Sequence, residues 1–179
     1  QRKWTEGFCL NVGCGDNPAG VGNVQLDINL YNYANFVQAD AHNLPFKDAC
    51  FDCVVFGDIL EHLVNPQKAL LEAARVTRKR IVISVPYEHR NPVGQHIQEM
   101  VDKYKKEDHS SWMQWQDTHG HPLIREVSED VLPHATHINT FSVEWLKELL
   151  DKLDMNIISW SYVPEDATGL WEWLIVLEK

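Results

Sequence analysis

Basic residues are scarce in this sequence, and their scarcity argues against a polyanionic partner. The 179 residues contain 16 Lys and Arg against 26 Asp and Glu, which gives a formal net charge of -10. Such a surface repels a phosphate polyanion on average, so nucleic acid is not expected as a general partner. Long apolar runs are missing as well, since none approaches the roughly 18 residues of a membrane-spanning helix. Because the first residues show no signal-peptide pattern, we expect a cytoplasmic protein without membrane contact.

Cysteine is also sparse, and its spacing does not suit a structural zinc site. The four cysteines are Cys9, Cys14, Cys50 and Cys53, of which the last two form a Cys-x-x-Cys pair. A zinc site needs a second pair at matching spacing, which Cys9 and Cys14 do not provide. We therefore expect free thiols in a reducing compartment, with Cys9 and Cys53 acting as small apolar residues in strands.

The apolar pattern that is present predicts one α/β domain over residues 1–179. An apolar content of 44% is enough to build a hydrophobic core. Short apolar runs alternate with turns and helical patterns, which favours a doubly wound, mostly parallel sheet. Strands are predicted at residues 8–12, 24–28, 36–40, 53–56, 80–85, 155–163 and 171–178, and helices after Asn65 and from Ser142 to about residue 153. The last two strands should pair as an antiparallel hairpin.

Residues 87–138 interrupt this alternation. They hold many His, Trp and charged residues and show little strand pattern. The segment is too long for an ordinary connection between two elements. We predict an insertion after the fifth strand that forms a lid or pocket wall on the substrate side.

Three polar features follow the first three predicted strands, where ligands of parallel sheets bind. The Gly-Cys-Gly turn at 13–15 allows a ligand to approach the backbone, because glycine adds no side chain. Pro18 stands where a dinucleotide-binding motif has its third glycine, so that motif is excluded. Asp27 is placed to bind a ribose diol, and Asp40 to accept from the exocyclic amine of an adenine. The alternatives are an exposed strand-end acid for Asp27 and a turn cap for Asp40.

Four motifs occur in order along the first half of the chain. They are Leu-Asn-Val-Gly-Cys-Gly-Asp at 10–16, Leu-Asp-Ile at 26–28, Ala-Asp-Ala-His-Asn-Leu-Pro-Phe at 39–46 and Phe-Asp-Cys-Val-Val-Phe-Gly-Asp-Ile-Leu-Glu-His-Leu at 51–63. Together they resemble the class I S-adenosylmethionine-dependent methyltransferases, in particular the small-molecule, type 11-like group. The resemblance covers most of residues 8–86 and resumes with His-Ile-Asn-Thr-Phe-Ser at 137–142.

The resemblance implies a seven-stranded Rossmann-like sheet with a reversed terminal strand, and S-adenosyl-L-methionine as the cofactor. The residues that it assigns to the cofactor are Gly13, Cys14 and Gly15 at the methionine part, Asp27 at the ribose hydroxyls, Ile28, Asp40 and Ala41 at the adenine, and Gly57 and Asp58 near the methionine amino group and the sulfonium. It implies methyl transfer to an oxygen or nitrogen of a small-molecule acceptor. His89 and His137 are the candidates for contact with that acceptor. The oligomeric state is left open.

Two other interpretations stay open. Some methyltransferases hold a divalent metal through an acid-x-x-Glu-His motif, which Asp58, Glu61 and His62 resemble. A Mg²⁺ or Mn²⁺ ion there would assist O-methylation of an RNA 3′ end or a catechol-like hydroxyl. The more ordinary interpretation is that Leu-Glu-His is a family signature without a metal. The second alternative is a binding or scaffold domain that keeps the fold and lacks the activity.

The sequence departs from the family pattern in the spacing of its first strands. Only 11 residues separate Val12 from Val24, whereas a crossover helix with its turns needs about a dozen or more. The segment between Asp27 and Val37 is similarly short. We therefore predict that the usual helix after the glycine turn is short or missing.

Overall fold

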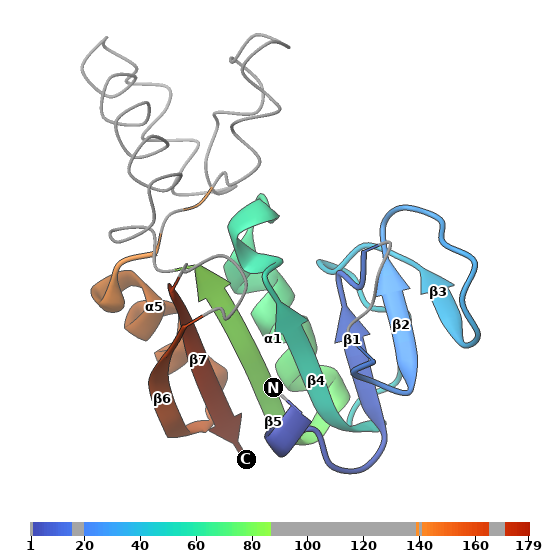
Figure 1. Cartoon of the computed structure of the whole chain (residues 1–179). Helices are drawn as coiled ribbons and strands as arrows, with labels where there is room; N and C mark the ends of the chain where they lie inside the picture. Colours follow the sequence, from blue (N-terminus) through green and yellow to red (C-terminus); the bar gives the residue numbers. More distant parts are fainter. Residues whose placement is uncertain (1, 16–19, 87–138, 140, 165–170) are drawn as a thin grey trace, which may run out of the picture.

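The predicted strands form one seven-stranded sheet in the order β3-β2-β1-β4-β5-β7-β6 (Figure 1). The computed structural model describes residues 2–15, 20–86, 139, 141–164 and 171–179. The strands are β1 (Cys9–Val12), β2 (Val24–Asp27), β3 (Phe36–Gln38), β4 (Phe51–Gly57), β5 (Thr77–Pro86), β6 (Asn156–Pro164) and β7 (Trp171–Glu178). The helices are η1 (Arg2–Trp4), η2 (Leu60–His62), α1 (Pro66–Val76), α5 (Val143–Leu150) and η3 (Asp151–Leu153).

Strand β7 runs antiparallel to both of its neighbours, β5 and β6, while the other neighbouring strands are parallel. This confirms the predicted sheet with its reversed strand and terminal hairpin. Strands β2 and β3 both end earlier than predicted, at Asp27 and Gln38, which are paired with each other. Since β3 lies at the edge and pairs only with β2, its ladder ends where β2 ends.

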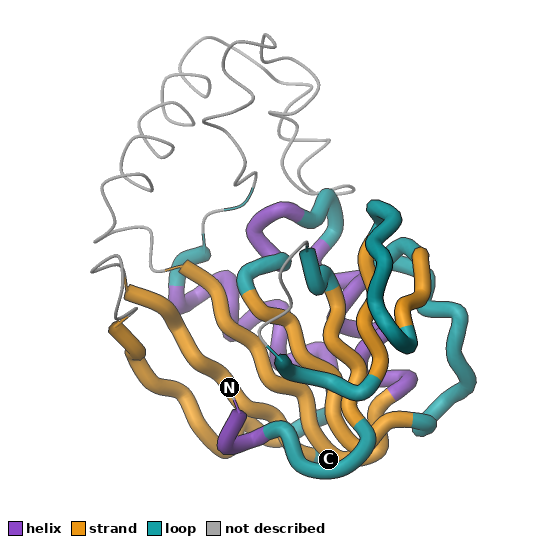
Figure 2. Tube along the Cα trace, turned by 45° about the vertical axis from the view of Figure 1, so that its right-hand side comes forward, coloured by secondary structure: helices purple, strands orange, loops and turns teal. Residues whose placement is uncertain are grey.

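Helices α1 and α5 pack on the same face of the sheet (Figures 1 and 2). Asn65 caps α1, because its side chain accepts a hydrogen bond from the Lys68 amide at 3.0 Å. Ser142 caps α5 in the same way, accepting from the Trp145 amide at 3.1 Å. The predicted apolar stripe of α1 is fully buried and consists of Ala69, Leu70, Ala73 and Val76. None of the described helices has the length and apolar character needed to cross a bilayer.

In the described part of the chain, the opposite face of the sheet is covered without α-helices. Trp4 of η1 and Val21 of the β1–β2 connection pack over buried side chains that include Cys9 and Cys53. Gln25 of β2 holds that connection in place by donating to the carbonyls of Val21 and Gly22 at 2.9 and 3.0 Å. Residues 28–35 contain no helix, and neither do the described residues of the 13–23 connection. The short spacings predicted this compression.

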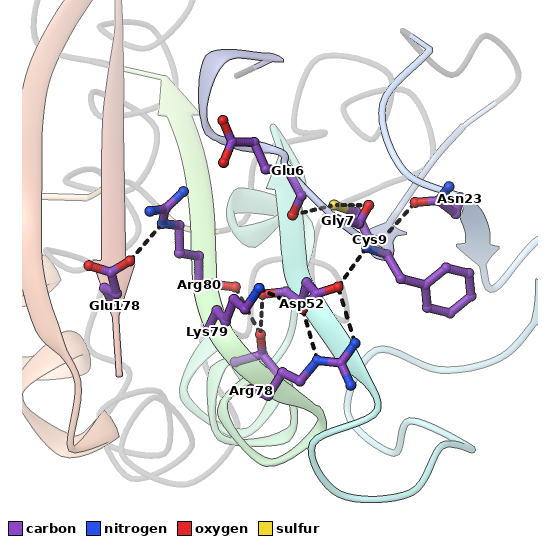
Figure 3. A network of polar contacts seen from close by, with 11 residues as sticks. Glu6, Gly7, Cys9, Asn23, Asp52, Arg78, Lys79, Arg80 and Glu178 are labelled. Carbon is purple, nitrogen blue, oxygen red and sulfur yellow. Dashed lines mark hydrogen bonds and ion pairs between the residues drawn. The ribbon is translucent and has the colours of Figure 1, made fainter.

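A polar network at the amino ends of the strands anchors the beginning of the chain (Figure 3). Asp52 accepts hydrogen bonds from the Phe8 amide at 2.9 Å and from Nε of Arg78 at 2.8 Å, and pairs with Nζ of Lys79 at 3.1 Å. The Arg78 contact, followed by that of Phe8, lowers the pKa of the Asp52 carboxyl below its usual value. The network joins β4 and β5 at the end of the sheet opposite to the one where ligands of such folds bind.

Candidate functional site

A cavity of about 590 Å³ opens beyond the carboxyl ends of the central strands, a volume that suits a nucleotide-sized ligand. Its lining comes from the end of β2 and from the segments that follow β1 to β4. The lining residues are Gly13, Leu26, Asp27, Ile28, Asn29, Ala39, Asp40, Ala41, His42, Ile59, His62, Leu63 and Val64. Five of the nine residues assigned to the cofactor by resemblance line this cavity: Gly13, Asp27, Ile28, Asp40 and Ala41. Cys14, Gly15, Gly57 and Asp58 are outside the lining, next to it along the chain.

The glycine turn after β1 adopts a backbone that other residues rarely take. Gly13 and Gly15 have φ angles of +69° and +62°. A Cβ atom on Gly13 would lie 2.4 Å from Cγ1 of Ile59, so this position excludes any side chain. The turn is also tied to β2, because the Gly13 amide donates to the Leu26 carbonyl at 2.8 Å. Tyr33 supports it from the β2–β3 connection by donating its hydroxyl to the Gly15 carbonyl at 3.2 Å.

Asp27 ends β2 with its carboxylate held by two backbone donors. Oδ2 accepts from the Gly15 amide at 3.0 Å, and Oδ1 accepts from the Asn29 amide at 2.9 Å. The residue lines the cavity although only 8% of its surface is exposed. A carboxylate offers about four acceptor positions, so each oxygen keeps one for a ligand hydroxyl. The neighbouring Cys14 thiol is buried, and burial together with the Asp27 charge raises its pKa to about 11.

Asp40 is engaged on one oxygen by His42. Its Oδ1 accepts from the His42 amide at 2.9 Å and lies 2.6 Å from Nδ1 of the His42 ring. Burial opposes the ionised form, but these hydrogen bonds outweigh it and lower the pKa of the Asp40 carboxyl. The predicted turn cap is therefore present, and the same carboxylate also lines the cavity. Ala41 lies beside it and is buried.

Asp58 follows β4 in a strained conformation. Its φ angle is +50°, which is unusual for a residue with a Cβ atom and is often found at functional sites. The strand end is fixed through β5, because the Asp58 amide donates to the Ser84 carbonyl at 3.1 Å and the Ser84 hydroxyl donates to Oδ1 of Asp58 at 3.2 Å. The carboxyl group thus has a defined position at the carboxyl end of the central strand.

The metal interpretation finds no support among the described residues. No three His, Cys, Asp or Glu side chains of that part of the chain lie close enough to hold an ion. Glu61 is only 1% exposed, and its Oε1 lies 3.9 Å from Nε2 of His62, which faces the cavity. Asp58 therefore does not join these two residues in a metal site. His89 and His137, and the predicted insertion at 87–138, lie outside the described residues.

Two residues whose hydrogen bonds organise the site, His42 and Asn139, were given no role from the sequence. His42 lies inside the quoted Ala-Asp-Ala-His motif, but its role depends on a contact with Asn65, whose amide donates to Nε2 at 3.2 Å. Asn139 is buried and clamps the η2 turn: its amide donates to the Glu61 carbonyl at 2.9 Å, and its Nδ2 donates to the Leu60 carbonyl at 3.0 Å. The only signal in the sequence was that Asn139 belongs to the second stretch of family resemblance.

Comparison with known proteins agrees with this site. Residues 12–83, from the end of β1 into β5, match a family described as a methyltransferase domain. A curated relative, the ubiquinone/menaquinone biosynthesis C-methyltransferase UbiE of Blochmanniella pennsylvanica, is 32% identical over 75 residues, which cover 41% of this chain and 30% of that protein. The chain thus spans about a third of the length of this relative.

Solved structures share this fold. A putative methyltransferase of Bacillus halodurans superposes with a TM-score of 0.62 at 14% identity, covering 96% of this chain and 92% of that one. The 1,6-didemethyltoxoflavin-N1-methyltransferase of Burkholderia thailandensis, solved with S-adenosylhomocysteine, has a TM-score of 0.58 at 16% identity and covers 96% and 70%. The matched methyltransferase domain over residues 12–83, the similarity to the curated relative and this strand order together support a class I S-adenosylmethionine-dependent methyltransferase.

Proposed function

We propose that the protein binds S-adenosyl-L-methionine in the cavity and transfers its methyl group to an oxygen or nitrogen of a small molecule. The observation that carries the proposal is Asp27, a buried carboxylate that faces the cavity and is held by two backbone amides. It would bind the ribose hydroxyls. Gly13 and Gly15 would border the methionine part, and the segment of Asp40 and Ala41 would border the adenine.

When bound, the cofactor supplies an electrophilic methyl group on its sulfonium. The chain then needs only to hold cofactor and acceptor at near-attack distance and to exclude water. The glycine turn and the strand ends at Asp27 and Asp58, which hydrogen bonds hold in place, would position the cofactor and the acceptor. A general base is required only where the acceptor loses a proton early, and His89 and His137 remain the candidates for that role.

The charge of the chain supports the acceptor class of the proposal. The net charge of -10 favours a small molecule over nucleic acid, and a cytoplasmic setting is proposed with it. We propose the 87–138 segment as the acceptor side of the cleft.

A second candidate is a carbon acceptor, because the curated relative that matches the cofactor-binding segment is named as a C-methyltransferase. Analysis of the methylated product by mass spectrometry and NMR separates the two candidates.

Calorimetry with S-adenosylmethionine and S-adenosylhomocysteine tests the cofactor part directly. We expect micromolar binding, which Asp27→Ala weakens by about 1–3 kcal/mol, because a ligand hydroxyl loses a charged partner. Glu148→Gln is the matched control, since it removes one exposed carboxylate of α5 far along the chain from the cavity and should leave affinity unchanged. A wild-type protein that binds neither ligand would refute the proposal.

Two further measurements separate the remaining alternatives. A metal-assisted enzyme would lose turnover in EDTA and regain it with Mg²⁺, whereas the proposed enzyme keeps its activity. A scaffold domain would bind the cofactor and methylate none of a panel of hydroxyl, amine and quinol acceptors.

A further inference from the structure

His42 is held between two segments of the cofactor cavity by both of its ring nitrogens. Nε2 accepts the amide hydrogen of Asn65, the cap of α1, at 3.2 Å. A nitrogen that accepts cannot carry a proton, so the hydrogen of the neutral ring is on Nδ1. Nδ1 lies 2.6 Å from Oδ1 of Asp40 and donates to it. The position of α1 therefore decides both the tautomer and the orientation of this ring.

The contact with His42 leaves the two oxygens of Asp40 in different states. Oδ1 accepts twice, from the ring and from the amide of His42. Oδ2 has no hydrogen-bond partner among the described residues, and 51% of the side chain is exposed, at the wall of the cavity. A charge-assisted hydrogen bond of this length holds the carboxylate in one rotamer. One acceptor oxygen is thus kept available for a ligand.

We propose that His42 is a positioning residue that fixes the Asp40 carboxylate for the exocyclic amino group of the cofactor, and so sets a preference for a 6-aminopurine over a 6-oxopurine. The inference rests on the proposed function, since it takes the cofactor to lie in this cavity. An amino group donates to Oδ2, whereas a 6-oxo group presents a second acceptor to the carboxylate. A fixed carboxylate cannot turn away from that repulsion, and a mobile one can.

Two isosteric substitutions separate this role from a purely structural one. In His42→Asn, the side-chain amide nitrogen takes about the place of Nδ1, so the donor to Asp40 stays and the link to Asn65 is lost. In His42→Gln, the terminal oxygen takes about the place of Nε2, so the link to Asn65 stays and the ring donor is lost. The His42 backbone amide still donates to Asp40 in both variants. A purely structural tie to α1 would be kept by His42→Gln and broken by His42→Asn.

The test is calorimetric titration of the wild type and both variants with S-adenosylhomocysteine and with S-inosylhomocysteine, its 6-oxopurine analogue. Thermal unfolding of each protein without ligand serves as the folding control. For S-adenosylhomocysteine, we expect His42→Gln to weaken binding about tenfold and His42→Asn to weaken it less than about threefold, in line with the loss or retention of one hydrogen bond to a charged group. For S-inosylhomocysteine, we expect His42→Gln to leave the weaker affinity unchanged or improve it.

Several results would overturn the inference. One is a His42→Gln variant that binds S-adenosylhomocysteine like the wild type. Another is a variant whose affinity falls by the same factor for both ligands, which would indicate a general distortion of the cavity. Equal losses in the two variants would also overturn it, because their only shared change is the missing ring. A wild type that binds neither ligand refutes the proposed function itself, which distinguishes the two failures.

Discussion

Arg75 offers a sharp test of how α1 holds the Leu-Pro-Phe segment at 44–46. From α1, its guanidinium donates to the carbonyls of Leu44 and Phe46 at 3.0 and 2.8 Å. It also pairs with Glu72 and Asp48, both at 2.8 Å. Glu72 in turn accepts from the Leu44 amide at 2.8 Å. Arg75 thus has four partners, and two of them are carbonyls of the Leu-Pro-Phe segment, which follows the cavity residues Asp40 to His42 along the chain.

The magnitude follows from these contacts. Arg75→Met keeps much of the aliphatic stem and leaves two backbone carbonyls without their donor, at about 1 kcal/mol each. The two carboxylates are partly or largely exposed, so their ion pairs together add at most about 1 kcal/mol. We expect the free energy of unfolding to fall by about 2–3 kcal/mol. Arg75→Lys should recover little of this loss, because an ammonium group lacks the planar fork that reaches several acceptors.

Urea unfolding followed by circular dichroism measures this effect. With an m-value of about 2 kcal/mol/M, the midpoint of Arg75→Met should lie about 1 M or more below that of the wild type. Lys47→Met is the matched control, since it removes an exposed positive charge from the same segment, and its midpoint should not change. If Arg75→Met lost less than about 0.5 kcal/mol, or Arg75→Lys were as stable as the wild type, the contacts would not carry the stability assigned to them.

Two other substitutions test the glycine turn and the polar network. Gly13→Ala and Gly15→Ala both place a Cβ atom at positive φ, but only the first meets Ile59, since no atom of the described residues lies within 4 Å of the second. We expect Gly13→Ala to abolish binding of S-adenosylhomocysteine in calorimetry, and we expect Gly15→Ala to lower thermal stability only modestly. If the two variants had equal effects in calorimetry and in thermal unfolding, this reasoning would be wrong. The pKa of the Asp52 carboxyl is lowered from 3.8 in the folded protein, so on acidification the unfolded chain takes up this proton first. The contribution of Asp52 to stability is therefore present above about pH 5 and is lost as the pH falls below 3.8. Urea titrations from about pH 6 to pH 3 should therefore show a smaller acid loss for Asp52→Asn than for the wild type, and parallel curves would refute the assignment.

The same network explains two strand boundaries that the pattern missed. The fourth strand was predicted from Cys53 and begins at Phe51, and the fifth was predicted from Arg80 and begins at Thr77. Charged residues interrupt the apolar pattern at both places. Asp52 and Arg78 are accommodated in the sheet because they pair with each other at 2.8 Å. A pattern along one segment cannot show such a partner, which lies 26 residues away.

The sequence by itself determined the features that depend on near neighbours. Buried runs produced the strands, Asn65 and Ser142 produced the helix starts, and the glycine turn and the acids at 27 and 40 appeared where strands end. These signals are local because hydrogen bonding and burial within one element repeat over a few residues. The short connections around β2 also followed from counting residues.

Only the tertiary structure decided which of these residues act together. The sheet order brings β1 between β2 and β4, and thereby places Ile59 against Gly13 in the lining of the cavity. His42 meets Asn65 across 23 residues, Arg75 meets Leu44 across 31, and Asn139 meets Leu60 across 79. Each of these contacts joins segments that become neighbours only when the strands pair and α1 docks on the sheet. Single positions of the sequence therefore predict which residue types supply the chemistry of the site, whereas its geometry depends on contacts between segments that are far apart in the chain.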